Sequence, residues 1–337
     1  MPETRTPILK AGVIGYGVGA KHAAAYHSMD GVELAVMCDL DAGKRTVATA
    51  AFPDAKVVSD AAEVLNDPSI DLVSIASHDD AHHAQVVAAL SAGKHVFVEK
   101  PFTLTEQSGR QAAAVCAEAG RVLAVGQNRR FAATTEEIKR MLEAGEFGTP
   151  LHCEANFSNP RPLTYSPDRW RAKRSESPGG GIAGMGVHMI DAMTYFLGPV
   201  TRVTAQAKRL AVPVDLDDTT SALFEFQSGA TGYLGILTAC PLTVFYNLYG
   251  TGANAFAAPD ANRLKLHRAG EEPAEVALMP IDTLLAELNE FADACAGGSA
   301  FRVSPEEAIH TVAVMQAMVA SAESGPAINI SSPTDAA

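Results

Sequence analysis

The first third of the chain alternates short, almost entirely apolar runs with longer amphipathic stretches, and this alternation limits the folds open to it. The apolar runs cover residues 8–15, 32–39, 72–77, 95–100 and 121–127, and helical stretches lie between them, beginning with residues 18–29. Strands that are apolar on both sides and separated by helices belong to a parallel sheet buried on both faces. Because crossover connections are right-handed, the pattern predicts a doubly wound sheet.

The pattern changes after about residue 130. Helices are expected at residues 134–144 and 182–197, and stretches of alternating polar and apolar residues follow at 201–210, 218–227, 231–238 and 244–250. Two closing helices are expected at 283–296 and 305–324. Strands followed by helices indicate an α+β domain with an open, mostly antiparallel sheet. Since 337 residues are too many for one ordinary domain, the sequence predicts two, at residues 1–128 and 129–337.

Composition excludes several classes of partner. The net charge of −13 disfavours nucleic acid and anionic membranes as partners. The five cysteines stand far apart with no CxxC pair, which indicates buried thiols in a reducing compartment. No apolar run approaches the roughly 18 residues of a membrane span, and the opening residues lack the apolar core of a signal peptide. We therefore expect a cytoplasmic protein without nucleic-acid or membrane partners.

A glycine-rich turn directly after the first strand carries the first chemical signal. Residues 15–20 have the pattern GxGxxA. Gly15 permits the tight turn, Gly17 lets a pyrophosphate approach the backbone, and Ala20 lets the following helix pack close to the sheet. The anion would then meet the free amides around Val18 and Gly19 at the positive end of the helix dipole.

An acidic residue at the end of the second strand strengthens this interpretation. Asp39 stands roughly twenty residues beyond the turn, where a carboxylate accepts hydrogen bonds from an adenine ribose. The same charge repels a 2′-phosphate, so the sequence favours NAD over NADP. Lys44 and Arg45 follow closely and could soften that preference. The alternative for Asp39 is a solvated carboxylate in a loop.

A lysine closes the fifth strand in the segment Glu99–Lys100–Pro101. The residue before a proline is held extended, so Lys100 is expected at the carboxyl edge of the sheet, where ligands bind in such folds. A lysine in such a place is also often a solvated cation. Together with Lys100, other residues near the ends of these strands are expected to line the cofactor site: Ser77, His82, Glu99 and Gln127.

A second candidate lies in the helix expected at 182–197. Gly184, His188 and Asp191 fall on one helix face by their spacing, although a lone histidine on an apolar helix is more often part of a core. No metal is expected, because His82 and His83 are adjacent and no HExxH or CxxC motif occurs.

Taken together, the chain resembles the glucose–fructose oxidoreductase / inositol dehydrogenase / MocA family of nicotinamide-dependent oxidoreductases. The segments that carry the resemblance are, in order, DPSIDLVSIAS, AGKHVFVEKPF, FGTPLHCEANF, GVHMID, FEFQSGATGYL and EEAIHTVAVMQAMVASAESG. The resemblance covers almost the whole chain, and the EKP segment in this context is its most specific part.

The resemblance implies an N-terminal Rossmann domain and a C-terminal α+β domain whose open sheet forms a homodimer or homotetramer. In the family the lysine of EKP serves catalysis and binds the nicotinamide ribose, which points to Lys100. The histidine of the GxH segment is the acid/base, which points to His188. An imidazole with an ordinary pKa of about 6.5 suits a base at physiological pH.

Two departures from the family pattern stand out. Many members carry an aspartate four residues before the histidine, and here that position is Gly184. Its absence weakens a carboxylate–imidazole pair and leaves room for a bulkier substrate. The other is Ser77–His78–Asp79, where the family usually has a threonine-proline-asparagine-like turn. The role of His78 stays open.

The resemblance implies a sugar, an inositol or a derivative of these as the small-molecule substrate. A cationic stretch around the only tryptophan adds a further class, because Arg forks suit carboxylates. Its members are Arg161, Arg169, Arg171, Lys173 and Arg174, with Trp170 among them. We expect Trp170, Arg171, His188 and Asp191 to contact substrate. The alternative is a loop paired to acidic neighbours or to a partner subunit.

A non-enzymatic function of the same fold is the main competing hypothesis. A cofactor sensor or regulatory protein needs the dinucleotide site but no acid/base, so the presence of both Lys100 and His188 favours an NAD-dependent dehydrogenase.

Overall fold

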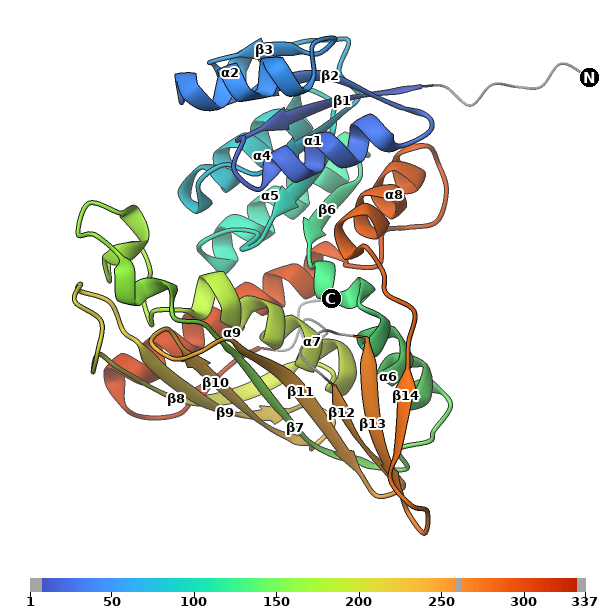
Figure 1. The fold of residues 1–337 in the computed structure, drawn as a ribbon, viewed down its shortest axis with the longest axis vertical. Coiled ribbons are helices and arrows are strands. Elements are labelled where there is room, and N and C mark those ends of the chain that lie inside the picture. Colours follow the sequence, from blue (N-terminus) through green and yellow to red (C-terminus); the bar gives the residue numbers. More distant parts are fainter. Residues whose placement is uncertain (1–7, 258–261, 332–337) are drawn as a thin grey trace, which may run out of the picture. The chain divides into compact units, whose positions relative to one another are not determined.

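The computed structural model describes residues 8–257 and 262–331, apart from the side chain of Trp170. Its contacts divide the chain into two compact units (Figure 1). The first comprises Met1–Asn128 and Asp282–Ile309, and the second comprises Arg129–Ile281 and His310–Ala337. No helix in the described ranges is long and apolar enough to cross a membrane.

The first unit contains the parallel sheet that the sequence predicts. Among its described residues, the strands have the order β3-β2-β1-β4-β5-β6, and every neighbouring pair is parallel. The strands are β1 Leu9–Ile14, β2 Val32–Cys38, β3 Lys56–Val58, β4 Leu72–Ile75, β5 His95–Glu99 and β6 Leu123–Gly126. β4 is buried along its whole length, as expected for a central strand covered on both faces.

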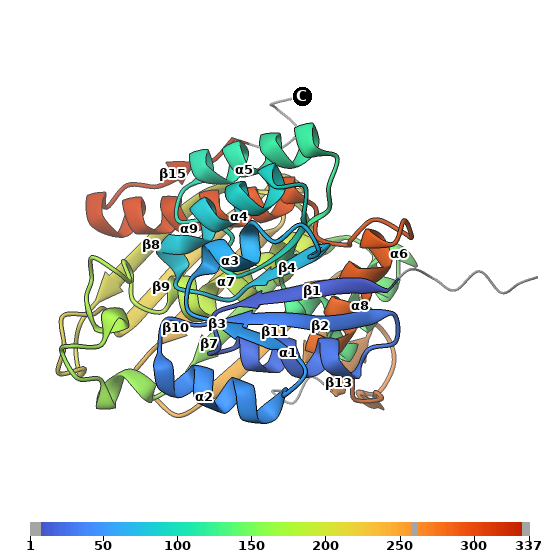
Figure 2. The ribbon, with the colours of Figure 1, turned by 90° about the horizontal axis from the view of Figure 1, so that it is seen from above.

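Helices cover both faces of this sheet. They are α1 Gly19–Ser28, α2 Ala42–Ala51, α3 Ala61–Leu65, α4 His82–Ser91 and α5 Glu106–Ala119. Figure 2 shows α4 and α5 on one side of β1 and β2, and α1 on the other. The predicted doubly wound Rossmann architecture is confirmed, and it brings the carboxyl ends of β1, β2, β4 and β5 to one edge.

A late segment of the chain belongs to this first unit. Helix α8, Thr283–Cys295, packs on α1, and the Phe291 ring lies 5.7 Å from that of Phe97 on β5. Phe301 approaches Phe97 to 6.3 Å. The division expected from the sequence assigned all residues after 128 to the second domain, whereas the structure groups Asp282–Ile309 with the first unit. The reason is this aromatic packing, which the periodicity of a helix does not reveal.

The second unit contains a mixed, mostly antiparallel sheet. Over its described residues the strand order is β14-β13-β12-β11-β7-β10-β9-β8-β15, and only the β7–β10 pair is parallel among them. The strands are β7 Pro150–Ser158, β8 Val200–Lys208, β9 Thr219–Phe226, β10 Thr231–Leu237, β11 Thr243–Gly250, β12 Ala253–Ala257, β13 Arg263–Arg268, β14 Ala274–Ala277 and β15 Ile328–Asn329. The predicted α+β class is confirmed.

One face of this sheet forms the core of the second unit. Helices α6 (Ala133–Glu143) and α7 (Val187–Leu197) and the later part of α9 (Pro305–Ser324) supply the other half of the core. Met189 and Met193 of α7 and Met318 of α9 are fully buried there. Burial alternates along β9 and β11, so every second side chain points away from these helices.

Candidate functional site

Three glycines, Gly15, Gly17 and Gly19, shape the turn between β1 and α1, each for a different physical reason. Gly15 has φ +93, and a Cβ there would collide with the Ala76 carbonyl oxygen, so the turn admits only glycine. At Gly17 a Cβ would meet no protein atom within 4 Å. The backbone at Gly17 is exposed, so a pyrophosphate has the open approach to it that the motif requires.

The close packing of helix on sheet falls on Gly19. A Cβ there would lie 3.0 Å from Val13 Cγ1 and 3.2 Å from Ala76 Cβ. Gly19 is buried, whereas Ala20 is only half-buried. Gly19, the first residue of α1, thus takes part in the close packing that the sequence predicts for Ala20.

The amino end of α1 is suited to an anion. Val18 precedes the helix, no side chain caps this end, and the first turn holds no acidic residue. The amides and the helix dipole are therefore available to a phosphate group.

Asp39 lies beside this turn and is fixed by it. Its carboxylate accepts hydrogen bonds from the Tyr16 N–H at 2.7 Å and the Asp41 N–H at 2.8 Å, and Lys44 Nζ lies 3.3 Å away. Burial acts to raise the pKa of Asp39, but these hydrogen bonds and the Lys44 charge outweigh it and hold the pKa below its usual range. The residue is therefore a fixed anion, and its remaining lone pairs suit a ribose hydroxyl. Together with the glycine turn, these residues fit NAD.

A buried hydrogen-bonded chain runs from α1 to the end of β5. His22 is fully buried, with Nε2 3.1 Å from Glu99 Oε1 and Nδ1 3.3 Å from Ser74 Oγ. Tyr26 OH lies 2.8 Å from the same Ser74 oxygen. Burial favours a higher pKa for Glu99, but the hydrogen bond and charge of His22 and the charge of Lys100 lower it. Glu99 is thus held as a carboxylate next to Lys100.

His22 was not identified from the sequence. It stands seven residues after Gly15 on a largely apolar helix, where a buried core histidine is the usual interpretation. Only the pairing of β1 with β4 and of β4 with β5 brings Ser74 and Glu99 to it.

Lys100 lies half-buried immediately beyond β5, at the carboxyl edge of the sheet, and is followed by a cis peptide bond to Pro101. The Pro101 carbonyl oxygen lies 2.8 Å from His82 Nδ1, and the His82 side chain is buried. His82 therefore fastens the segment that carries Lys100. This contact gives His82 a positioning role, and the direct cofactor contact expected from the sequence stays a prediction.

Two other expected cofactor residues lie at neighbouring strand ends. Ser77 follows β4, and its hydroxyl donates to Gln85 Oε1 at 2.7 Å. Gln127 follows β6 and is 2 % exposed; within residues 8–257 and 262–331 its Oε1 has no hydrogen-bond partner. His78 is exposed and precedes the short helical turn Asp79–Ala81.

His188, in the second unit, is the second residue of α7 and follows a π-helical turn, Ile182–Gly186. Its ring lies 6.0 Å from the ring of Phe157 on β7. The Arg129 guanidinium lies over the same Phe157 ring, 5.0 Å from its centroid. Burial lowers the pKa of Arg129. The half-buried His188 imidazole therefore contacts the Phe157 ring, and the Arg129 cation contacts the same ring.

Asp191 makes a different contact from the one expected. Arg130 Nε and Nη2 donate to its two carboxylate oxygens at 2.9 and 2.8 Å, and both side chains are almost completely buried. The Arg130 guanidinium also lies 4.6 Å from the Tyr195 ring centroid. Because both oxygens are engaged away from solvent, the geometry assigns Asp191 to holding α7 in place and not to the predicted contact with substrate.

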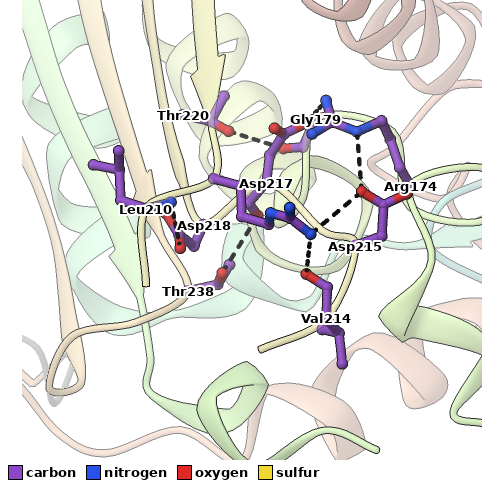
Figure 3. A network of polar contacts seen from close by, with 10 residues as sticks. Arg174, Gly179, Leu210, Val214, Asp215, Asp217, Asp218, Thr220 and Thr238 are labelled. Atoms are coloured by element: carbon purple, nitrogen blue, oxygen red, sulfur yellow. Dashed lines mark hydrogen bonds and ion pairs between the residues drawn. The ribbon is translucent and has the colours of Figure 1, made fainter. Parts of the chain in front are cut away.

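The cationic stretch divides into paired and available residues. Arg174 Nη1 donates to Asp217 Oδ2 at 2.8 Å, and its Nε lies 3.9 Å from Asp215 (Figure 3). For Arg174 the expected pairing with acidic neighbours is thus present. Arg171 is half-buried in the turn Trp170–Ala172, and the Trp170 side chain lies outside the described part of the structure. Arg161 and Arg169 line a hollow discussed below.

Gly184 faces open space one turn before His188. A Cβ there would meet no atom of the described residues within 4 Å, whereas at Gly181 it would lie 2.5 Å from Ile236 Cγ2 and 2.6 Å from Met185 Cε. The site therefore has room at the position where many family members carry an aspartate.

This difference predicts opposite effects of two similar substitutions. Gly184→Ala is expected to raise the free energy of unfolding by about 0.5–1 kcal/mol, because it restricts the unfolded chain without a clash. Gly181→Ala is expected to lower it by about 1–3 kcal/mol through overpacking. Urea unfolding of both variants measures the difference, and destabilisation by both to the same extent would contradict the open space at Gly184.

Comparison with known proteins places both units in one family. Residues 9–127 match the model of the oxidoreductase family with an NAD-binding Rossmann fold, and residues 135–255 match the GFO/IDH/MocA C-terminal domain. The chain is 34% identical over 247 residues to the uncharacterized oxidoreductase YdgJ of Escherichia coli (strain K12), covering 72% of this chain and 69% of the relative.

Two further proteins match over nearly their whole length. Inositol 2-dehydrogenase 3 of Saccharopolyspora erythraea is 29% identical, covering 96% of this chain and 95% of the relative. An NAD-binding oxidoreductase from Klebsiella pneumoniae shares the fold, with a TM-score of 0.88 at 23% identity, over 96% of this chain and 99% of that one. The chain is thus an enzyme of the GFO/IDH/MocA family, an oxidoreductase whose Rossmann domain binds NAD.

Proposed function

We propose that this protein moves a hydride between NAD and a secondary alcohol of a sugar, an inositol or a sugar-acid-like compound, with Lys100 and His188 as the catalytic pair. The observation that carries the proposal is the position of Lys100 at the carboxyl edge of the NAD-binding sheet, beside the fixed Glu99 carboxylate. The inositol dehydrogenase relative supports an alcohol substrate with several hydroxyl groups.

In the proposed oxidation, His188 accepts the proton of the substrate hydroxyl as the carbon–hydrogen bond breaks. Lys100 donates a hydrogen bond to the same oxygen and stabilises the negative charge that develops on it. When bound, NAD supplies the acceptor for the hydride. The products are the ketone, the reduced cofactor and a protonated His188; ketone reduction uses the same groups in reverse.

Glu99 and His22 support this step without touching the substrate. The Glu99 carboxylate is adjacent to Lys100 in sequence and accepts a hydrogen bond from the Lys100 N–H at 3.2 Å. We therefore place the buried chain Tyr26–Ser74–His22–Glu99 as the support that holds Lys100 in position at the end of β5.

The alternative function is a non-catalytic NAD-binding sensor of the same fold. A variant without His188 distinguishes the dehydrogenase from the sensor, because a sensor needs only the dinucleotide site.

His188→Ala is expected to bind NADH with a Kd within about twofold of wild type and to lose turnover by about 10²–10⁴-fold, the usual contribution of a general base. NADH fluorescence titration and absorbance at the nicotinamide band measure the two quantities. The control is His27→Ala, which removes an exposed imidazole; its Kd for NADH and its turnover should match those of wild type. Full activity of His188→Ala would remove the proposed role of His188.

Asp39→Asn is expected to reduce the preference for NAD over NADP by at least about tenfold, the ratio that 1.4 kcal/mol provides. The amide oxygen can still accept from the Tyr16 N–H, so the turn keeps its shape while the charge that repels a 2′-phosphate is lost. The kcat/KM ratio for the two cofactors is the measurement, with the exposed Asp30→Asn as control. An unchanged ratio would show that Asp39 does not set the cofactor preference.

We also propose that the chain forms a homodimer or homotetramer through the helix-free face of the second sheet. Leu223 and Tyr233 are register partners on β9 and β10 and are 59% and 39% exposed. A row of rings continues on β7, β11, β12 and β13, from His152 to Tyr249 (6.0 Å), Phe256 (5.7 Å) and His267 (4.9 Å). These exposed apolar and aromatic side chains, beside the exposed Arg202–Glu225 ion pair on β8 and β9, fit a second copy of the chain.

Leu223→Glu is expected to lower the oligomeric mass, because it would bury an unpaired charge in the interface. Sedimentation velocity measures the change. The solvent-exposed Leu40→Glu in the first unit is the control and should leave the mass unchanged. A wild-type monomer at high concentration, or an unaffected oligomer in Leu223→Glu, would contradict the proposed interface.

A further inference from the structure

A hollow with a basic wall lies on the second unit, in the loop that follows β7. It has a volume of about 280 Å³. Two arginines and three residues with hydroxyl groups line it: Arg161, Thr164, Tyr165, Ser166 and Arg169. The net charge of the chain is −13. The charged residues that line the hollow, in contrast, are both basic.

The two arginines of the hollow have no acidic partner in the part of the chain that the structure describes. Within residues 8–257 and 262–331, neither Arg161 nor Arg169 has a carboxylate within ion-pair distance. Arg174, in the same loop, is paired with Asp217 at 2.8 Å. The loop therefore uses one arginine for its own attachment and leaves two guanidinium groups for another partner.

The hollow is held in shape by contacts on both sides. The Arg161 N–H donates to Asn159 Oδ1 at 3.0 Å, and the Thr164 hydroxyl donates to the Arg161 carbonyl at 3.0 Å. The Arg169 guanidinium lies 4.4 Å from the Tyr165 ring centroid. A cation over an aromatic face is oriented as well as attracted, so Arg169 is presented in a defined direction.

The loop that forms the hollow packs against a small hydrophobic cluster that is separate from the main core. Tyr165 packs against a cluster of four buried side chains: Ala172, Val212, Val214 and Leu216. The Asp218 carboxylate accepts hydrogen bonds from the N–H groups of Leu210, Ala211 and Val212. It thereby fixes the loop segment that supplies the other side of this cluster (Figure 3). Although burial opposes it, these hydrogen bonds lower the pKa of Asp218, so the anchor persists at neutral pH.

The same loop is tied to the helical turn before the candidate catalytic histidine. Asn159, which holds Arg161 through its Oδ1, also donates from Nδ2 to Met185 Sδ at 2.7 Å. Met185 stands three residues, one helical turn, before His188 on the continuous Ile182–Leu197 helical segment. A chain of two contacts therefore connects the basic hollow to the turn that presents His188.

We propose that this hollow binds the oxyanion of the substrate, a carboxylate or a phosphate, while the hydroxyl that reacts lies at His188. This rests on the proposed function and narrows its substrate class to polyhydroxylated compounds that carry an acidic group. Arg161 and Arg169 supply the planar donor pairs that match such oxygens, and the Tyr165 and Ser166 hydroxyls add neutral donors. Neutral sugars and inositols would occupy the site at His188 and leave the hollow empty.

The test compares neutral and acidic substrates on the full chain with NAD. The panel pairs a hexose and myo-inositol with a hexuronic acid, an aldonic acid and a hexose phosphate. In the double variant Arg161→Met/Arg169→Met, KM for the acidic substrate is expected to rise about 10–100-fold, as loss of charge-assisted hydrogen bonds predicts. Its kcat and the kinetics of neutral substrates should change less than twofold. Lys173→Met, an exposed cation of the same loop, is the matched control and should behave as wild type.

A binding measurement separates failure of this inference from failure of the proposed reaction. Calorimetric titration of the chain with hexuronate and with inorganic phosphate requires no turnover. Binding of either probe to wild type and to Lys173→Met, but not to the double variant, supports the hollow and shows which anion it takes. If neither probe binds, or if the double variant binds equally well, the inference is overturned. Absence of turnover with every substrate, despite anion binding at the hollow, would count against the oxidoreductase proposal instead.

Discussion

The close approach of α1 to the carboxyl ends of β1 and β4 is the constraint on which the first unit depends. Gly15 and Gly19 permit it, because a Cβ at either would press on Ala76. The same approach aims the Tyr16 N–H at Asp39 and brings His22 to Glu99. One turn therefore sets the open backbone that we propose for a pyrophosphate, the carboxylate that we propose for a ribose, and the support of the strand end that carries Lys100.

The second unit uses charge differently. It buries Arg130 with Asp191 to fix α7, seats the Arg129 guanidinium on Phe157 beside His188, and leaves Arg161 and Arg169 at a hollow. A buried bidentate pair is fully compensated and positions a helix, whereas exposed guanidinium groups retain their capacity to bind. Arg130 thus serves structure, whereas Arg161 and Arg169 are the cations that we propose for a ligand.

The parts of this account that the sequence predicts are those with a local signature. The alternation of strands and helices, the Gly15–Gly17 turn, Asp39 at the end of β2 and Lys100 before a proline all depend on short spacings. The buried chain through His22 could not be predicted, because Ser74 and Glu99 are 52 and 77 positions away in sequence. The role of Asp191 and the placement of α8 in the first unit likewise depend on Arg130 and Phe97, which only the tertiary fold brings near.

The central claim is that the turn at residues 15–20 holds NAD and is coupled by α1 to the strand end that carries Lys100. Hydrogen–deuterium exchange with and without saturating NADH tests it directly. Increased amide protection is expected at residues 15–20 and around Asp39 and Lys100, with no change along β12 and β13. Unchanged exchange at residues 15–20 in the presence of bound NADH would contradict it.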